Sequence, residues 1–184
     1  MHLFVDGGAS NGKATDRFLM NHTPENWCIY QFEPTIRHAP ILQEKAFMNP
    51  NIHFIPKALW VEDGYLVFND YGEKFESNNL IDENTKEIDY LGQPKEIEYL
   101  VECIDFLRWI KENTKQFHYK ILKLDVEGAE FFILNKMIEK KMIGIFNEYW
   151  IEFHARFDRS LFSPIKNIIV TELKKKRRKL EFLW

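Results

Sequence analysis

The sequence lacks the features that would place it in several large classes of protein. It has two cysteines among 184 residues, Cys28 and Cys103, and neither belongs to a C-x-x-C pair. Each lies in an apolar run, which favours buried, reduced thiols over a zinc site or a disulfide. No apolar run approaches the roughly 18 residues of a membrane span, and Asp6 and the glycines beside it interrupt the N-terminus before a signal peptide can form. We therefore expect a soluble protein of a reducing compartment, the cytoplasm.

The charge also lacks a dominant sign. Lys and Arg number 25 and Asp and Glu number 28, a net charge of −3, so the sequence has no basic excess of the kind typical of nucleic-acid-binding domains. A basic run at 174–179 is better interpreted as a solvated helix end than as a nuclear or nucleic-acid signal. The length fits one domain, residues 1–184, and no internal repeat or linker divides it.

Apolar runs alternate with amphipathic segments along the chain. This alternation predicts an α/β fold with a mostly parallel central sheet flanked by helices, an α/β/α sandwich. The polar stretch from residue 69 to 95 has little regular pattern, and loops of that length are usually functional lids or lack order, so we treat it as a candidate lid or acceptor loop. The expected strands are 2–5, 27–32, 52–60, 65–68, 96–103, 119–124, 144–153 and 180–184, and the expected helices are 13–20, 36–48, 104–113, 129–140 and 163–176.

The dinucleotide-binding motif G-x-G-x-x-G is absent, and a different glycine turn stands after the first strand. The stretch VDGGASNG at 5–12 runs from the strand into this turn. Glycines let the backbone turn tightly and approach a ligand, and the helix that follows points free N–H groups at it. Asp6 would repel a pyrophosphate but suits a cationic amine, which favours a donor such as S-adenosylmethionine. Taken alone, the glycine turn is as compatible with a purely structural role as with ligand binding.

Two acids follow other predicted strands. Glu33 lies 21 residues after Gly12 (33 − 12), the spacing and strand end at which α/β folds bind ribose hydroxyls. The alternative for Glu33 is an exposed acid before a proline turn. Asp125 ends the strand at 119–124, where open α/β sheets bind ligands.

Further carboxylates and a histidine surround Asp125 in the predicted fold. Glu127 and Glu130 suit the start of the next helix, but three carboxylates in six residues also suggest a cation, a positively charged ligand or a base. Alternation along 144–153 brings Glu152 and His154 beside Asp125. His154 can act as a general base, the three can bind a divalent metal, or the histidine can be structural.

Together, these stretches resemble FkbM-type methyltransferases. The resemblance rests on VDGGASNG at 5–12, FEP at 32–34, KLDVEGAE at 123–130 and IEFH at 151–154, which span nearly the whole chain. The DVEGAE block is the most specific of them. The resemblance implies a class I, Rossmann-like methyltransferase fold, S-adenosylmethionine as the donor, and methylation of a hydroxyl oxygen, most often of a sugar or a polyketide-like product.

The resemblance also implies a set of donor-binding residues. Carried over by position, Glu33 would hold the ribose and Asp125 would lie near the transferred methyl group. The other expected donor contacts are Asp6, Gly8 and Gly12 at the methionine end, Ala58 and Leu59 near the adenine, and Gly7, Ser10 and Pro34 as neighbours in the same turns.

We expect an in-line methyl transfer in which the protein mainly positions the two reacting atoms and excludes water. The expected catalytic residues are Asp125, Glu152 and His154, with His154 or a carboxylate beside it taking the hydroxyl proton. If a divalent metal, Mg²⁺ or Mn²⁺, takes part, Asp125 and Glu152 would hold it. Two other classes stay open, a catalytically inactive binding module and a nicotinamide-dependent oxidoreductase, which the missing G-x-G-x-x-G disfavours.

The sequence begins almost at its first strand, whereas methyltransferases of this fold commonly carry upstream helices that cover the donor. We therefore expect the cover to come from residues 69–95, from the second subunit of a homo-oligomer or from a partner domain. The expected acceptor is a small molecule or a carbohydrate, and we expect neither nucleic acid nor a membrane span.

Overall fold

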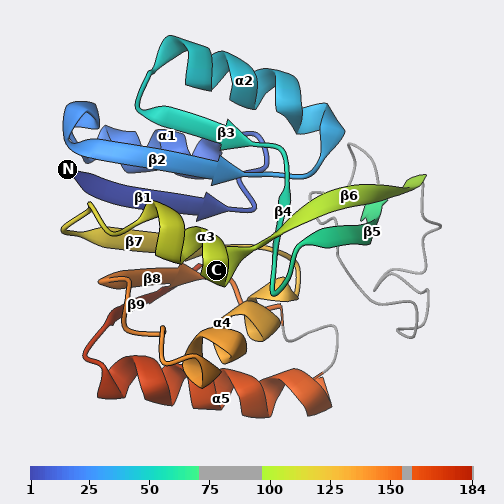
Figure 1. Cartoon of the computed structure of the whole chain (residues 1–184), viewed down its shortest axis with the longest axis vertical. Helices are drawn as coiled ribbons and strands as arrows, with labels where there is room; N and C mark the ends of the chain where they lie inside the picture. Colours follow the sequence, from blue (N-terminus) through green and yellow to red (C-terminus); the bar gives the residue numbers. More distant parts are fainter. Residues whose placement is uncertain (71–96, 155–158, 184) are drawn as a thin grey trace.

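The computed structural model describes residues 1–70, 97–154 and 159–183, and six of its strands form one parallel sheet (Figure 1). Their order is β3-β2-β1-β7-β8-β9, and each neighbouring pair is parallel. This order is that of the doubly wound nucleotide-binding fold. The strands are added outward in one direction from β1 to β3 and in the opposite direction from β7 to β9, so the strand order reverses between β1 and β7. The strands are β1 (His2–Gly7), β2 (Trp27–Phe32), β3 (Ile52–Ile55), β7 (Lys120–Leu124), β8 (Glu148–Ile151) and β9 (Lys179–Phe182).

Helices cover the two faces of this sheet. Right-handed crossovers put α1 and α2 on one face and α4 and α5 on the other, because the order reverses between β1 and β7. On the first face, Phe18 stacks on Phe4, with ring centroids 4.2 Å apart. On the second face, α3, α4 and α5 share one core cluster. The predicted α/β/α fold is thus confirmed. The helices are α1 (Lys13–Met20), α2 (Ala39–Met48), α3 (Phe106–Asn113), α4 (Ala129–Glu139) and α5 (Arg159–Lys175), with 3₁₀ turns η1 (Pro24–Asn26) and η2 (Ile36–His38).

A second, three-stranded sheet stands beside the first. It contains β4 (Ala58–Trp60), β5 (Gly64–Asp70) and β6 (Ile97–Asp105) in the order β4-β6-β5, with β4 parallel and β5 antiparallel to β6. The prediction of one strand over 52–60 is therefore wrong. The chain bends at Pro56, which has no N–H for a ladder, and β3 and β4 join different sheets. Of the candidate lid at 69–95, the first two residues end β5 and the others lie outside the described residues.

Two other predicted elements have different bounds. β8 begins at Glu148 rather than at residue 144, because residues 142–146 form turns in which the Ile145 N–H donates to the Met142 carbonyl over 3.0 Å. The last helix begins by Arg159, so Pro164 lies inside it rather than at its start.

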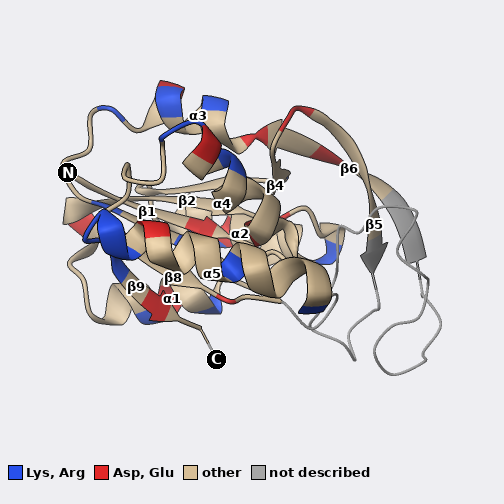
Figure 2. Cartoon of the chain, turned by 90° about the horizontal axis from the view of Figure 1, so that it is seen from below, with Lys and Arg blue, Asp and Glu red and all other residues tan. Residues whose placement is uncertain are grey.

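Cys28 and Cys103 are buried and free, as expected, and burial raises the pKa of both thiols. The basic run at 174–179 spans the end of α5, a turn and the start of β9, and Figure 2 shows acidic and basic residues interspersed over the described chain. None of the described helices is long and apolar enough to span a membrane.

Candidate functional site

A cavity of about 810 Å³ opens at the carboxyl ends of the central strands. It lies where the strand order reverses between β1 and β7, the position at which doubly wound sheets bind ligands. Its walls include Gly8 after β1, Glu33 after β2, Leu59 on β4 and Asp125 after β7. The fold therefore brings residues from four separate stretches of sequence to one cavity.

The glycine turn after β1 is shaped by close packing against the neighbouring strands. Gly8 has φ +74°, and a Cβ there would lie 1.8 Å from the carbonyl oxygen of Asp125. At Gly7 a Cβ would lie 2.8 Å from the Leu59 side chain, and at Gly12, with φ +82°, 2.7 Å from Lys45. Of these glycines, Gly8 lines the cavity, while Gly7 and Gly12 fit the turn against its surroundings.

Glu33 ties this turn to the end of β2. Its carboxylate accepts the Ser10 N–H at 2.7 Å with one oxygen and the Thr35 N–H at 2.9 Å with the other. Glu33 is 6% exposed and lines the cavity together with Ser10, Pro34 and Leu59. A carboxylate has about four acceptor positions, so both oxygens keep capacity for a hydroxyl group in the cavity.

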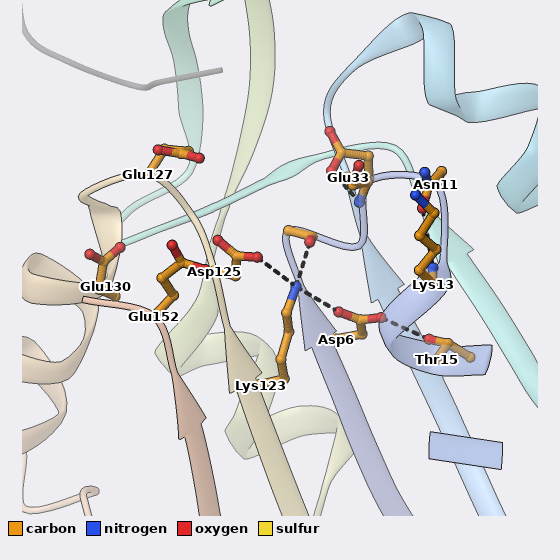
Figure 3. A network of polar contacts seen from close by, with 12 residues as sticks. Asp6, Asn11, Lys13, Thr15, Glu33, Lys123, Asp125, Glu127, Glu130 and Glu152 are labelled. Atoms are coloured by element: carbon orange, nitrogen blue, oxygen red, sulfur yellow. Dashed lines mark hydrogen bonds and ion pairs between the residues drawn. The ribbon is translucent and has the colours of Figure 1, made fainter. Parts of the chain in front are cut away.

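A buried lysine joins the turn to β7 (Figure 3). Lys123 is 4% exposed, donates to the Gly8 carbonyl at 2.6 Å, and lies 3.2 Å from Asp6 and 3.5 Å from Asp125. Burial lowers the pKa of Lys123, but the negative charges of Asp6, Asp125 and Glu33 together raise it by more. The net shift of the pKa is therefore upward, and the lysine stays protonated. This cation therefore holds together the two strands that flank the reversal.

Asp6 occupies a different place from the one expected. It is fully buried and does not line the cavity. One oxygen faces Lys123, and the other accepts the Thr15 hydroxyl at 2.7 Å. The Thr15 oxygen in turn accepts the Gln31 amide at 2.9 Å. The Asp6 carboxylate therefore lies behind the cavity wall, and its two oxygens face Lys123 and Thr15.

His154 is the centre of a second polar cluster and is 1% exposed. Its Nδ1 lies 3.2 Å from Glu130 Oε1, which also accepts the His154 backbone N–H at 2.8 Å. Its Nε2 lies 3.3 Å from Glu127, 3.5 Å from Glu152 and 3.7 Å from Asp125. Burial lowers the pKa of His154, but the hydrogen bond to Glu130 and the charges of Glu127 and Asp125 outweigh it, and the net shift is upward.

The carboxylates of this cluster, rather than the imidazole, line the cavity. Asp125, Glu127 and Glu152 are wall residues and His154 is not. A ligand in the cavity would thus touch carboxylates that His154 supports from behind. The described structure brings most of the sequence-predicted residues to this cavity, namely Gly8, Ser10, Glu33, Pro34, Ala58, Leu59, Asp125 and Glu152, but not Asp6, Gly7, Gly12 and His154.

Sequence reasoning missed two members of this site. Lys123 was assigned only to a core strand, although a lysine in an apolar strand is seldom buried without a charged partner. For Glu130 the sequence suggests a helix-start acid or a member of a carboxylate cluster that faces a cation or ligand. Glu130 is instead fully buried against His154, and its second oxygen accepts the Gly128 N–H at 2.9 Å. No sequence signal separates such a buried acid from an exposed one at a helix start.

Comparisons with known proteins give one structural neighbour. The sequence matches no family model, and no match to a curated protein was found. The structure is similar to the crystal structure of methyltransferase FkbM from Methylobacillus flagellatus KT, with a TM-score of 0.56 and 13% sequence identity. The similarity covers 92% of this chain and 37% of that chain, so the chain spans little more than a third of that protein's length. At this identity the likeness shows the fold, a Rossmann-like α/β fold shared with a methyltransferase.

Proposed function

We propose that the chain is a methyltransferase of the FkbM type that uses S-adenosylmethionine to methylate a hydroxyl group of a small molecule or glycan, with a sugar as the expected acceptor. One observation carries the proposal: Glu33, the Gly8 turn and Asp125 line one cavity at the reversal of the strand order. The structural neighbour, a methyltransferase of the same fold, supports it.

The donor fits the half of the cavity next to β1, β2 and β4. Glu33 would accept hydrogen bonds from the two ribose hydroxyls, because each of its oxygens retains acceptor capacity. Ala58 and Leu59 are buried, apolar wall residues and suit the adenine ring. The Gly8 and Ser10 turn would face the methionine end. The sulfonium would then lie toward Asp125, whose carboxylate favours a positive charge.

The acceptor fits the half of the cavity next to β7 and β8. There the acceptor oxygen attacks the methyl carbon, the carbon–sulfur bond breaks, and its electron pair returns to sulfur as a neutral thioether. The hydroxyl proton passes to Asp125 or Glu152, which line the cavity. His154 would keep these carboxylates in place. The contribution of the protein is thus mainly to orient two reactants and to hold a proton acceptor beside them.

Calorimetric titration with S-adenosylhomocysteine and with NADH tests the proposal. We expect saturable binding of one S-adenosylhomocysteine per chain and none of NADH. Binding of NADH in place of S-adenosylhomocysteine would instead indicate an oxidoreductase. If neither ligand binds, the proposed donor site is wrong.

A pair of variants assigns the binding to the cavity. Glu33→Gln should weaken S-adenosylhomocysteine binding by about tenfold or more, since hydrogen bonds to a charged group contribute about 1.5–3 kcal/mol. Glu44→Gln is the matched control, because Glu44 is exposed on α2 and does not line the cavity. Thermal unfolding of both variants separates lost binding from lost folding. Labelled donor offered with sugar acceptors and with polyketide-like acceptors then tests the acceptor class.

A further inference from the structure

We infer that the chain binds one divalent metal ion, of the Mn²⁺ and Mg²⁺ class, between Asp125, Glu127 and His154. One ligand atom of each residue lies within 4.8 Å of the others. Asp125 and Glu127 lie in the loop between β7 and α4, and His154 lies in the segment after β8. Two of them line the cavity, so an ion held here would face a bound ligand.

The spacing of the carboxylate oxygens around His154 Nε2 suits an ion. Oxygen and nitrogen ligands lie about 2.0–2.2 Å from such an ion, which sets neighbouring ligand atoms roughly 3–4 Å apart. His154 Nε2 is 3.3 Å from Glu127 Oε2 and 3.7 Å from Asp125 Oδ1. Glu152 Oε1, at 3.5 Å from the same nitrogen, offers a fourth ligand atom. Two or three carboxylates with one imidazole favour a hard or borderline divalent ion.

The outer partners of the three ligands hold them in the orientation that an ion requires. Metal-binding histidines usually give their second ring nitrogen to a carboxylate, which fixes the ring and its tautomer. Glu130, which is fully buried on α4, lies 3.2 Å from His154 Nδ1, so that Nε2 is turned toward the other carboxylates. On the other side Lys123 lies near Asp125 Oδ2, and the other oxygen, Oδ1, faces His154.

A proton shared between His154 and the same carboxylates is the competing occupant. Charge-assisted N–H···O bonds are about 2.7–2.9 Å long, whereas the three distances from Nε2 run from 3.3 to 3.7 Å. These longer distances are those found between ligand atoms of one ion. A metal ion and a proton compete for the same Nε2 lone pair, so the metal titration decides between the two occupants.

The role of this ion rests on the proposed methyl transfer. It would lie on the acceptor side of the cavity, beside Asp125, where it can bind the acceptor hydroxyl and lower the pKa of that group. The binding site itself does not depend on that reaction. The two claims can therefore fail separately.

Titration of the metal-free chain with Mn²⁺ tests the site. The protein is freed of metal with a chelator, and the signal of free Mn²⁺ is followed by electron paramagnetic resonance. We expect one bound Mn²⁺ per chain, displaced by excess Mg²⁺. Glu127→Gln should weaken binding by about tenfold or more, and Glu130→Gln by about 10–100-fold as an outer partner of the histidine. Glu139→Gln, an exposed change on the same helix, should leave the affinity unchanged.

Outcomes of this titration are distinct from those of the donor titration. Glu127 is partly exposed, so its variant is expected to fold even if the Glu130 variant does not. The inference is overturned if Mn²⁺ does not bind saturably, or if Glu127→Gln binds it as tightly as the unchanged chain. S-adenosylhomocysteine binding measured in the presence of the chelator reports on the donor site alone. Retained donor binding without Mn²⁺ binding would reject the metal site and leave the proposed function standing.

Discussion

The two walls of the cavity are built by different means. On the β1 side the backbone is packed so closely that glycine is required, and Gly8 lies against the carbonyl of Asp125. On the β7 side the wall is formed by acidic and basic side chains, with Lys123 beside Asp125 and with further carboxylates that His154 contacts from behind. The β1 side, called the first wall below, thus has a fixed shape, and the β7 side, called the second wall, carries charged groups. This division matches a site in which one half binds a donor and the other half handles a proton.

The two walls meet at two atoms of the same residue. The Gly8 carbonyl accepts a hydrogen bond from the Lys123 ammonium at 2.6 Å. The Gly8 Cα lies so close to the Asp125 carbonyl that a side chain on it would clash. Steric changes should therefore damage the first wall whatever their charge. In the second wall the loss of a charge should matter more than a change of shape.

Gly8→Ala should have the largest effect. The methyl group would lie 1.8 Å from a backbone oxygen at a φ of +74°, and neither strand can move without breaking the ladder between them. We expect a loss of about 4 kcal/mol or more in the free energy of unfolding, measured by urea denaturation. The control is Gly144→Ala, whose nearest neighbour would be 3.7 Å away and which should change stability by about 0.5 kcal/mol or less. Equal stability of the two variants would show that the first wall is not sterically fixed.

Lys123→Met should have the next largest effect. It keeps most of the side-chain volume but leaves the Asp6 carboxylate buried without its cation, which costs about 3–5 kcal/mol for a buried pair. Adding Asp6→Asn should recover part of that loss, because it removes the stranded charge. The unfolding free energies of the single and double variants give the coupling. The control, Lys175→Met, removes a cation that is 65% exposed and should cost about 1 kcal/mol or less. Additive losses at Lys123 and Asp6 would mean that charge does not hold the second wall.

Glu148→Gln should have the smallest effect and tests whether the sensitivity to charge extends along β8. Burial raises the pKa of Glu148, but hydrogen bonds from Tyr119, Lys179 and Trp150 outweigh it and lower the pKa. A carboxyl whose pKa is lowered in the folded state stabilises the fold above its unfolded pKa, and this contribution disappears as the pH falls through the folded pKa. The variant should therefore be less stable at neutral pH by about 1 kcal/mol, since Gln keeps one acceptor oxygen.

The pH dependence of this difference is the decisive measurement. The gap in unfolding free energy between Glu148→Gln and the unchanged chain should shrink as the pH falls below 4.5, the ordinary pKa of a glutamate carboxyl. A gap that stays constant from pH 7 to pH 3 would mean that the ionised carboxylate contributes nothing to stability.

The sequence allowed most of the fold to be predicted, and the reasons are local. Apolar periodicity places the core strands, and Pro40 falls in the first turn of α2, whereas Pro164 lies inside α5 and misplaced its predicted start. The small sheet was not predicted as such. Pro56 indicates an irregular point in the 52–60 run, but that run does not show that its two halves join different sheets. Strand partners depend on tertiary packing, and periodicity within one strand does not specify them.

The candidate site was predictable where a residue ends a strand and less so where it depends on a neighbouring strand. Glu33 and Asp125 reach the cavity because strand ends of a doubly wound sheet do so. Asp6 was expected to face the ligand, but it is the direct partner of Lys123 in the β1–β7 ladder. That register is invisible in the sequence of either strand alone, and so is the pairing that turns Asp6 away from the cavity.

A crystal structure of the chain with S-adenosylhomocysteine tests the central claim most directly. We expect the ribose hydroxyls to lie within hydrogen-bonding distance of the Glu33 carboxylate, the adenine to contact Leu59, and the sulfur to point toward Asp125. A ligand bound elsewhere, or one bound in the cavity without contact to Glu33, would contradict the assignment of the β1 wall to the donor.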